Sequence, residues 1–243
     1  MTETFAALLL AHVLADFLFQ TGWMVANKRR PLALGAHGGV VLATAIAATG
    51  SLHPALLILT LTHLAIDAVK TFALRRGLWP FLADQAAHLA VLAGVAAWVP
   101  GLWAGGLWSG VSNLPALMAI AAGALLATRA GGFAIGLLME PWAAELMRKP
   151  GHSPGLLNGG LVIGHLERGL IFLLVLTGQT EGIGFLIAAK SVLRFGTVGD
   201  DRAVSEYVII GTLASFGWAI AASFLTVALL THLPPLGIPD LSP

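Results

Sequence analysis

Histidine and aspartate recur as pairs in the first hundred residues, and the two members of each pair are four positions apart. The pairs are His12 with Asp16, His63 with Asp67, and Asp84 with His88. Residues four positions apart share one face of an α-helix, so each pair would present a carboxylate and an imidazole together. These groups are ligands for zinc and similar ions, and they also transfer protons. The spacing therefore indicates metal binding or proton chemistry.

The sequence around these pairs is strongly apolar. Hydrophobic residues make up 57% of the 243 residues, charged residues only 10%, and the mean hydropathy is +0.86. Soluble domains have about 45–50% apolar and about 25% charged residues, so this composition indicates an integral membrane protein. The net charge of +1 gives no reason to expect a nucleic-acid partner. Because the chain has no cysteine, imidazole and oxygen ligands would have to hold any metal.

Apolar runs of about 17–25 residues can cross a lipid bilayer as helices. The sequence predicts an all-α, polytopic transmembrane helical bundle with about seven or eight spans. The predicted spans are 4–22, 33–49, 54–74, 81–99, 114–138, 157–178, 181–196 and 205–231.

Basic residues predict the orientation, because short cytoplasmic loops carry an excess of Lys and Arg. Basic clusters at 28–30, 75–76 and 148–149 follow the first, third and fifth spans, whereas the loops around 50–54 and 100–113 are uncharged. We therefore expect the N-terminus and the C-terminus outside.

This layout predicts two membrane modules. The first is a four-helix module with the His/Asp pairs over residues 1–100, followed by an extracytoplasmic loop over 101–113. The second covers residues 114–243 and includes a cytoplasmic loop near 139–156.

In this orientation each paired aspartate lies nearer the cytoplasm than its histidine. His37 falls at the depth of the carboxylates, at a rise of about 1.5 Å per residue. The first four spans should converge on one pocket holding a divalent metal, with zinc as the expected ion and room for one ion or two. The predicted ligands are His12, Asp16, His37, His63, Asp67, Asp84 and His88, and the candidate catalytic residues among them are Asp16, Asp67 and Asp84.

A purely structural role is the alternative, because polar residues in a span can form hydrogen bonds that only hold helices together. Three acids with no basic partner in the same spans would repel one another or take up protons. Each costs about 2.5–3.5 kcal/mol near the membrane centre on insertion scales, so intramembrane acids are functional candidates. A bound divalent cation removes the repulsion, which favours the metal site.

A second polar cluster lies in the C-terminal half. Glu167 and Arg168 fall in the sixth span, Lys190 and Arg194 are four apart in the seventh, and Glu206 begins the eighth. In one interpretation Glu167 and Glu206 form structural ion pairs with the basic residues. In the other, Lys190, Arg194 and Arg168 bind an anionic head group, since arginine matches phosphate geometry.

The first hundred residues resemble the bacterial membrane family catalogued as domain of unknown function 3307 (DUF3307), through AHVLADFLFQ, a lone histidine after the basic loop, THLAIDAVK and DQAAHL. Its longer members have a C-terminal half similar to IGHLERGLIFLLVL, AAKSVLRFG and SEYVIIGTLAS. The resemblance implies a multi-pass protein of the bacterial inner (cytoplasmic) membrane and carries no activity. The His-x-x-x-Asp pairs also resemble those of bacterial membrane-bound metal-dependent hydrolases, at the level of the motif.

Three functions are compatible with these residues. The first is a membrane-embedded metal-dependent hydrolase near the cytoplasmic leaflet, acting on a phosphorylated lipid or a membrane-adjacent peptide. The second is a divalent-cation or proton-coupled transporter, and the third is a non-catalytic membrane scaffold or sensor. Transporters often contain paired repeats with broken helices. The two halves show no such symmetry, which favours the hydrolase, and the oligomeric state is left open.

Overall fold

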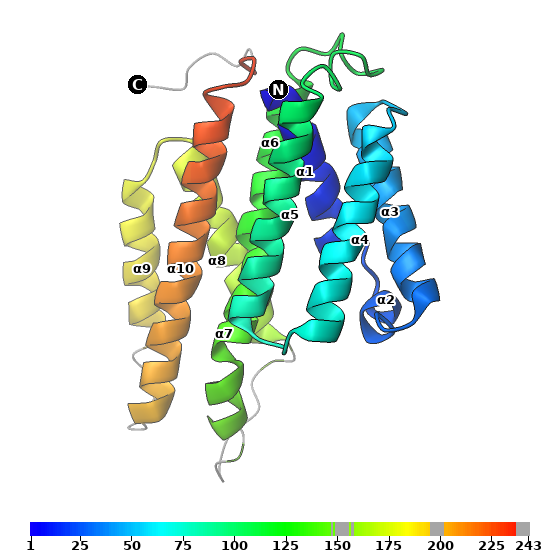
Figure 1. Cartoon of the computed structure of the whole chain (residues 1–243). Coiled ribbons are helices and arrows are strands. Elements are labelled where there is room, and N and C mark those ends of the chain that lie inside the picture. The colour runs from blue at the N-terminus through cyan, green and yellow to red at the C-terminus, as the bar shows by residue number, and fades with distance from the viewer. Residues whose placement is uncertain (147, 149–155, 157, 195–201, 237–243) are drawn as a thin grey trace. The chain divides into compact units, whose positions relative to one another are not determined.

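The computed structural model describes residues 1–146, 148, 156, 158–194 and 202–236, apart from the side chains of residues 193 and 194. Helices form the regular structure of this part of the chain, and no strand occurs within it. The elements in Figure 1 are α1 (Thr2–Phe17), α2 (Gly22–Ala26), α3 (Pro31–Thr49), α4 (Ala55–Ala73), α5 (Leu78–Trp98), α6 (Leu114–Leu125), the π-helical turn η1 (Leu126–Ala130), α7 (Gly131–Leu146), α8 (Gly159–Leu176), α9 (Glu181–Arg194) and α10 (Arg202–Leu230). The predicted all-α class is confirmed.

Six helical segments in the described part of the chain are long and apolar enough to cross a membrane. They are Pro31–Thr49, Ala55–Ala73, Leu78–Trp98, Leu114–Leu146, Gly159–Leu176 and Arg202–Leu230. The chain is therefore a multi-pass membrane protein, as predicted. Helices also cover the other two predicted spans, but they are shorter, because α1 has 16 residues and α9 has 14.

Two predicted boundaries differ from the structure by more than three residues. The first span was expected to reach residue 22, but α1 ends at Phe17, because the Thr21 side chain accepts a hydrogen bond from the Met24 amide and caps the short helix α2. The fifth predicted span, 114–138, continues through η1 to the end of α7. The loop expected near 139–156 thus begins as helix, and most of its remaining residues lie outside the described part.

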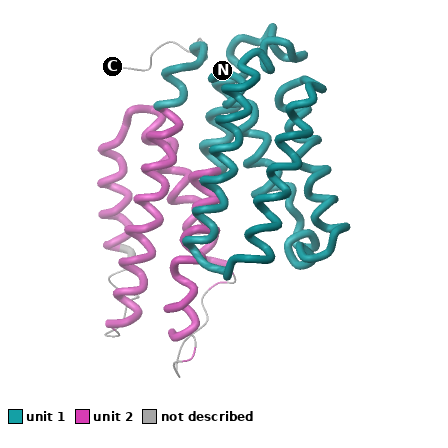
Figure 2. Tube along the Cα trace, in the orientation of Figure 1, with its two compact units in different colours: residues 1–125, 228–239 teal, residues 126–227, 240–243 magenta. Residues whose placement is uncertain are grey.

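The chain divides into two compact units, coloured in Figure 2. Unit 1 contains residues 1–125 and 228–239, and unit 2 contains residues 126–227 and 240–243. Unit 1 therefore includes α6 as well as the helices of the first hundred residues.

Unit 1 is built around α1, which packs against α3, α5 and α6. Ala6, Ala7 and Ala11 of α1 are at most 2% exposed, and such small residues let neighbouring helices approach closely. Figure 1 shows α1 and α4 running in one direction and α3 and α5 in the other. The basic segments 28–30 and 75–76 consequently share one end of unit 1.

The segment between α5 and α6 covers the opposite end of unit 1. At the start of α1, the Thr4 hydroxyl donates a hydrogen bond to the Pro100 carbonyl at 3.0 Å. At the end of α3, the Trp108 indole donates to the Ala47 carbonyl at 2.8 Å. These contacts tie residues 99–113 to two of the helices that carry the polar residues.

Unit 2 contains the π-helical turn η1. The Leu126 carbonyl accepts a hydrogen bond from the Trp218 indole at 2.9 Å, and the Thr128 carbonyl accepts two from the Arg168 guanidinium. A π-helical turn shifts carbonyls out of the regular helical ladder, and such turns are frequent at functional sites. Buried apolar residues of α8 and α10 pack together beside it.

Gly106→Ala tests the packing of the 99–113 segment. A Cβ at Gly106 would overlap the Thr49 carbonyl oxygen, which is backbone at the end of α3. We expect the variant to lower the free energy of unfolding by about 1–3 kcal/mol, the usual cost of overpacking, in thermal unfolding of the detergent-solubilised protein. Gly110→Ala is the control, because a Cβ there meets nothing within 4 Å. Equal losses in the two variants would contradict the packing described.

Candidate metal centre

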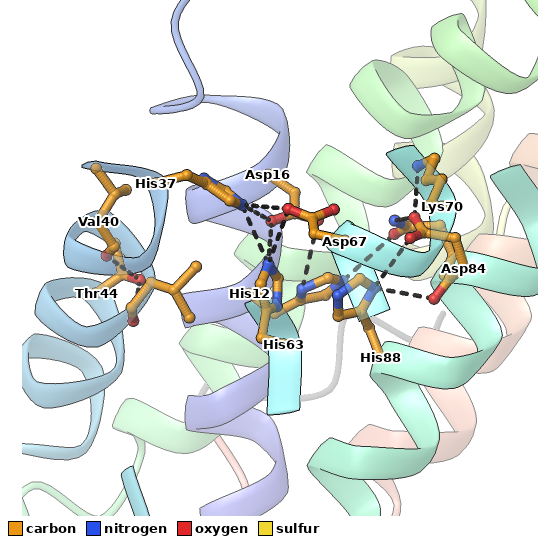
Figure 3. A network of polar contacts seen from close by, with 12 residues as sticks. His12, Asp16, His37, Val40, Thr44, His63, Asp67, Lys70, Asp84 and His88 are labelled. Carbon is orange, nitrogen blue, oxygen red and sulfur yellow. Dashed lines mark hydrogen bonds and ion pairs between the residues drawn. The ribbon is translucent and has the colours of Figure 1, made fainter. Parts of the chain in front are cut away.

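Seven polar side chains from four helices of unit 1 converge in one cluster, which we call the His/Asp centre (Figure 3). They are His12 and Asp16 from α1, His37 from α3, His63 and Asp67 from α4, and Asp84 and His88 from α5. The Asp16 side chain is 10% exposed, and the other six residues are at most 4% exposed. The i, i+4 spacing explains the convergence, because each pair directs both side chains from one helix face into the shared interior.

The centre is layered in the way that the sequence predicts. On α1, α4 and α5, the aspartate lies one helical turn nearer the basic end of unit 1 than its histidine. Figure 3 shows His12, His63 and His88 in a row beside the carboxylates, whereas His37 lies next to Asp16 and Asp67. The imidazoles of His63 and His88 are in ring contact, with centroids 4.0 Å apart.

Four donor atoms face one another at the middle of the centre. His37 Nε2 and His63 Nε2 are 3.1 Å apart. Asp16 Oδ1 lies 3.4 Å from the first nitrogen and 3.3 Å from the second. Asp67 Oδ2 lies 3.2 Å from His37 Nε2 and 3.9 Å from His63 Nε2. We call these four atoms the central donor set.

The separations that involve the two histidine nitrogens of the central donor set are near those of a tetrahedral metal site. Ligand atoms at the zinc bond length of about 2.0–2.1 Å lie roughly 3.3–3.4 Å from one another in a tetrahedron. These five separations, 3.1–3.9 Å, bracket that value. Two facing imidazole nitrogens share only one proton in a hydrogen bond, whereas a cation between them satisfies both lone pairs. These buried groups can therefore hold a metal ion.

A second donor set adjoins the first and consists of His12, Asp16 and His88, whose ligand atoms lie within 4.8 Å of one another. The Nδ1–H of His88 donates to the Asp84 carbonyl at 2.9 Å, which leaves Nε2 with a lone pair. The Nε2–H of His12 donates to Gln85 Oε1 at 3.3 Å, which leaves Nδ1 with a lone pair, 3.8 Å from Asp16 Oδ2. Among the described residues neither lone pair has a hydrogen-bond partner.

The orientation of these two rings is typical of metal ligands. A histidine that binds a metal through one nitrogen usually donates a hydrogen bond from the other, which fixes the tautomer and the ring plane. His12 and His88 both donate such a hydrogen bond from one ring nitrogen. Asp16 faces the central set through Oδ1 and the second set through Oδ2, so it can serve both.

Two lysines that the sequence analysis left outside the centre are part of it. Lys28 Nζ lies 3.2 Å from Asp67 Oδ1, and Lys70 Nζ lies 2.6 Å from Asp84 Oδ2. The expectation that the acids have no basic partner in the same spans was wrong. A lysine near a helix end extends a long apolar stem, so its charge acts far from its backbone position. Spacing along one helix gave no signal for these pairs: Lys70 follows Asp67 by three residues, but its ammonium group contacts Asp84 of α5 instead.

Each lysine contacts only one oxygen of its carboxylate. Lys28 contacts Oδ1 of Asp67, whereas Oδ2 faces the two histidines. On Asp84, Lys70 and the Gln85 amide, at 3.1 Å, both donate to Oδ2. Asp84 Oδ1 is buried and has no hydrogen-bond partner among the described residues. The ammonium groups thus orient these carboxylates without blocking the second oxygen of either.

Asp16 is the acid in the centre that has no lysine in contact among the described residues; its contacts are His12, His37 and His63. With neutral imidazoles, the three carboxylates and two ammonium groups leave one negative charge. A divalent cation or an imidazolium can balance it.

The two glutamates of the predicted polar cluster in the C-terminal half have different partners. Glu167 forms an ion pair with Lys190, with Oε2 and Nζ 2.7 Å apart. Glu206 accepts a hydrogen bond from Arg202 at 2.7 Å, on a surface where the arginine side chain is 91% exposed.

The other two basic residues of that cluster are Arg168 and Arg194. Arg168 is 4% exposed and donates to the Thr128 carbonyl and the Ser215 hydroxyl. The side chain of Arg194 lies outside the described part.

Comparison with known proteins agrees with the N-terminal motifs. Residues 4–104 match the model of a family described as a protein of unknown function, DUF3307. The matched segment holds all seven residues of the His/Asp centre and both lysines that pair with it. No curated protein and no solved structure matches the chain. The resemblance of the C-terminal half stays a prediction.

Lys70→Met tests whether this lysine compensates the buried Asp84. The Asp84 side chain is 1% exposed, so loss of the ammonium group leaves a buried carboxylate unpaired. We expect the free energy of unfolding in detergent to fall by about 3 kcal/mol. Arg202→Met is the matched control, because it breaks an exposed ion pair whose loss should change the free energy of unfolding little. Similar losses in both variants would exclude a buried compensating role for Lys70.

Proposed function

We propose that the protein is a membrane-embedded, metal-dependent hydrolase of the bacterial inner membrane, with its His/Asp centre as the catalytic site. The central donor set is the observation that carries the proposal. His37 Nε2, His63 Nε2 and Asp16 Oδ1 lie 3.1–3.4 Å from one another, and Asp67 Oδ2 is the fourth atom. Two imidazole nitrogens with two carboxylate oxygens favour zinc, because magnesium and calcium prefer oxygen ligands throughout.

Asp84 is the best candidate for the general base. Asp16 and Asp67 are used as ligands in the proposed site, which leaves Asp84 as the third predicted catalytic acid. Its Oδ1 lies 3.9 Å from His88 Nδ1 and has no hydrogen bond among the described residues, so it can accept a proton. A bound zinc ion would supply Lewis acidity and allow water to act as a nucleophile at neutral pH. Lys70 and Gln85 hold the Asp84 carboxylate in place.

A cavity beside the centre supports a lipid substrate. It lies along α4 and α5, has a volume of about 370 Å³, and is lined by Lys70, Asp84 and mainly apolar residues such as Ile66, Val69 and Leu74. Apolar walls accommodate an acyl chain, and the Lys70 ammonium group attracts a phosphate. We therefore propose a phosphorylated lipid as the substrate class. The loop charges orient the centre toward the cytoplasmic leaflet.

A divalent-cation or proton-coupled transporter is the second candidate function. The Lys28–Asp67 and Lys70–Asp84 pairs favour it, because a lysine that releases its proton to water when a metal ion binds the same carboxylate would couple cation movement to proton movement. A scaffold or sensor is the third candidate, in which the buried pairs specify only how the helices pack.

Metal analysis is the first test of the centre. We expect protein purified in detergent without chelator to contain zinc by inductively coupled plasma mass spectrometry. Asp16→Asn should weaken zinc binding by about tenfold or more, because this residue faces both donor sets. His37→Gln should have a similar effect, and His232→Gln is its control, since His232 is an exposed histidine near the C-terminal end of α10. Unchanged zinc binding in Asp16→Asn after reloading would exclude the site.

A turnover assay separates the hydrolase from the transporter. With vesicles that contain a phosphatidic acid, we expect zinc-dependent release of phosphate. Asp84→Asn should keep the bound zinc and lower the rate by about 10²–10⁴-fold, as for loss of a general base. The matching measurement is zinc uptake into sealed proteoliposomes. Uptake without turnover would replace the hydrolase with the transporter, and bound zinc with neither activity would favour the scaffold.

A further inference from the structure

Arg168 in unit 2 is a buried cation whose described hydrogen-bond partners are all neutral. It lies in the span Gly159–Leu176 and is 4% exposed. Its Nε and Nη2 donate to the Thr128 carbonyl at 3.2 and 3.0 Å, and its Nη1 donates to the Ser215 hydroxyl at 3.0 Å. A guanidinium has five N–H donors, so these three bonds leave two for another ligand.

The neighbouring carboxylate acts on Arg168 electrostatically but forms no ion pair with it. Glu167 is adjacent in the sequence, but its Oε2 lies 2.7 Å from Lys190 Nζ. The described residues place no carboxylate within ion-pair distance of the Arg168 guanidinium. Glu167, Lys190 and Arg168 together therefore have a net charge of +1. An unpaired buried charge is costly, so this surplus favours an anion nearby.

A cavity next to Arg168 has room for such an anion. Its volume is about 420 Å³. Its lining includes Arg168, Lys190, Ser215 and the Glu167 carboxylate that pairs with Lys190, together with apolar residues such as Ile135 and Met139. The Ser215 hydroxyl accepts a hydrogen bond from Arg168 and keeps its own proton to donate. The cavity thus combines a cationic, hydrogen-bonding part with apolar walls.

Glycines keep the guanidinium and the cavity open. A Cβ at Gly164 would lie 2.9 Å from Arg168 Nη1, and one at Gly132 would lie 3.2 Å from Nη2. Gly136 also lines the cavity, and a Cβ there meets nothing within 4 Å, so this part of the wall is open space. The π-helical turn η1 adds the Thr128 carbonyl, which holds one edge of the guanidinium. The side chain is therefore fixed by neutral groups while part of it stays available.

We infer that this cavity binds a phosphate group, with Arg168 as its anchor and the Ser215 hydroxyl as a further donor. Arginine presents a planar fork of donors that matches phosphate oxygens. The apolar walls also accommodate an acyl chain attached to the phosphate. A phospholipid head group and a free phosphate share this chemistry. The site lies in unit 2 and uses no residue of the His/Asp centre.

Binding measurements on the full-length protein in detergent test the site. The probes are dioctanoyl phosphatidic acid, inorganic phosphate and uncharged dioctanoylglycerol. We expect the phosphatidic acid to bind and dioctanoylglycerol to bind far more weakly. Arg168→Gln should weaken the binding of phosphatidic acid by about tenfold or more, because it removes charge-assisted hydrogen bonds. Arg202→Gln is the control, since it removes an exposed arginine of the same unit.

A second variant keeps the test valid if Arg168→Gln fails to fold. Gly136→Leu fills the cavity and leaves the hydrogen bonds of Arg168 intact, whereas Gly184→Leu adds the same side chain on α9, where a Cβ also meets nothing within 4 Å. We expect only Gly136→Leu to weaken binding.

The probes also distinguish the two phosphate sources. Inorganic phosphate that binds as tightly as the phosphatidic acid, with the same dependence on Arg168, would support a site for a free phosphate. Tighter binding of the phosphatidic acid would support a lipid head group. Wild-type binding of both probes by Arg168→Gln and Gly136→Leu, or no binding by the wild-type protein, would overturn the inference. Only the binding that Arg168→Gln and Gly136→Leu weaken reports on this site, because phosphatidic acid is also the proposed substrate class of the His/Asp centre.

Discussion

A carboxylate buried among membrane-spanning helices needs polar partners inside the protein. In unit 1, the position of Asp16 shows how the packing of the helices supplies them. Its helix, α1, packs against three others, so the residue lies where side chains from several helices can reach it. One oxygen faces His37 and His63, and the other faces His12. These contacts connect three helices through one side chain. The same geometry brings together groups that could hold a metal ion.

Lys28 and Lys70 compensate the charges of Asp67 and Asp84 while leaving one oxygen of each carboxylate able to bind a ligand or a proton. Each ammonium group contacts one carboxylate oxygen and leaves the second free of it. Breaking a buried pair is costly because it exposes an unpaired charge to a low-dielectric interior, so these pairs also restrict how the helices can pack. Order in the centre and stability of unit 1 therefore depend on the same contacts.

Each unit contains a cluster of polar side chains with a net charge, and the two net charges have opposite signs. The His/Asp centre has one more carboxylate than ammonium group, which favours a cation. The cluster of Glu167, Lys190 and Arg168 has one more cation than carboxylate, which favours an anion. In an aqueous protein such differences are neutralised by solvent ions at little cost, but in apolar surroundings they select a ligand of the opposite charge.

The sequence by itself determined the membrane class, and it predicted the approximate helical segments and the seven histidines and aspartates of the His/Asp centre. Apolar run length and the i, i+4 period are local properties, and they predict which residues share a helix face without any knowledge of packing. Only the tertiary structure decided which atoms meet. It showed that Lys28 and Lys70 reach the carboxylates, that each oxygen of Asp16 faces a different donor set, and that Glu167 pairs with Lys190 rather than Arg168. Long flexible side chains choose partners by the positions of neighbouring helices, and spacing along one helix does not contain that information.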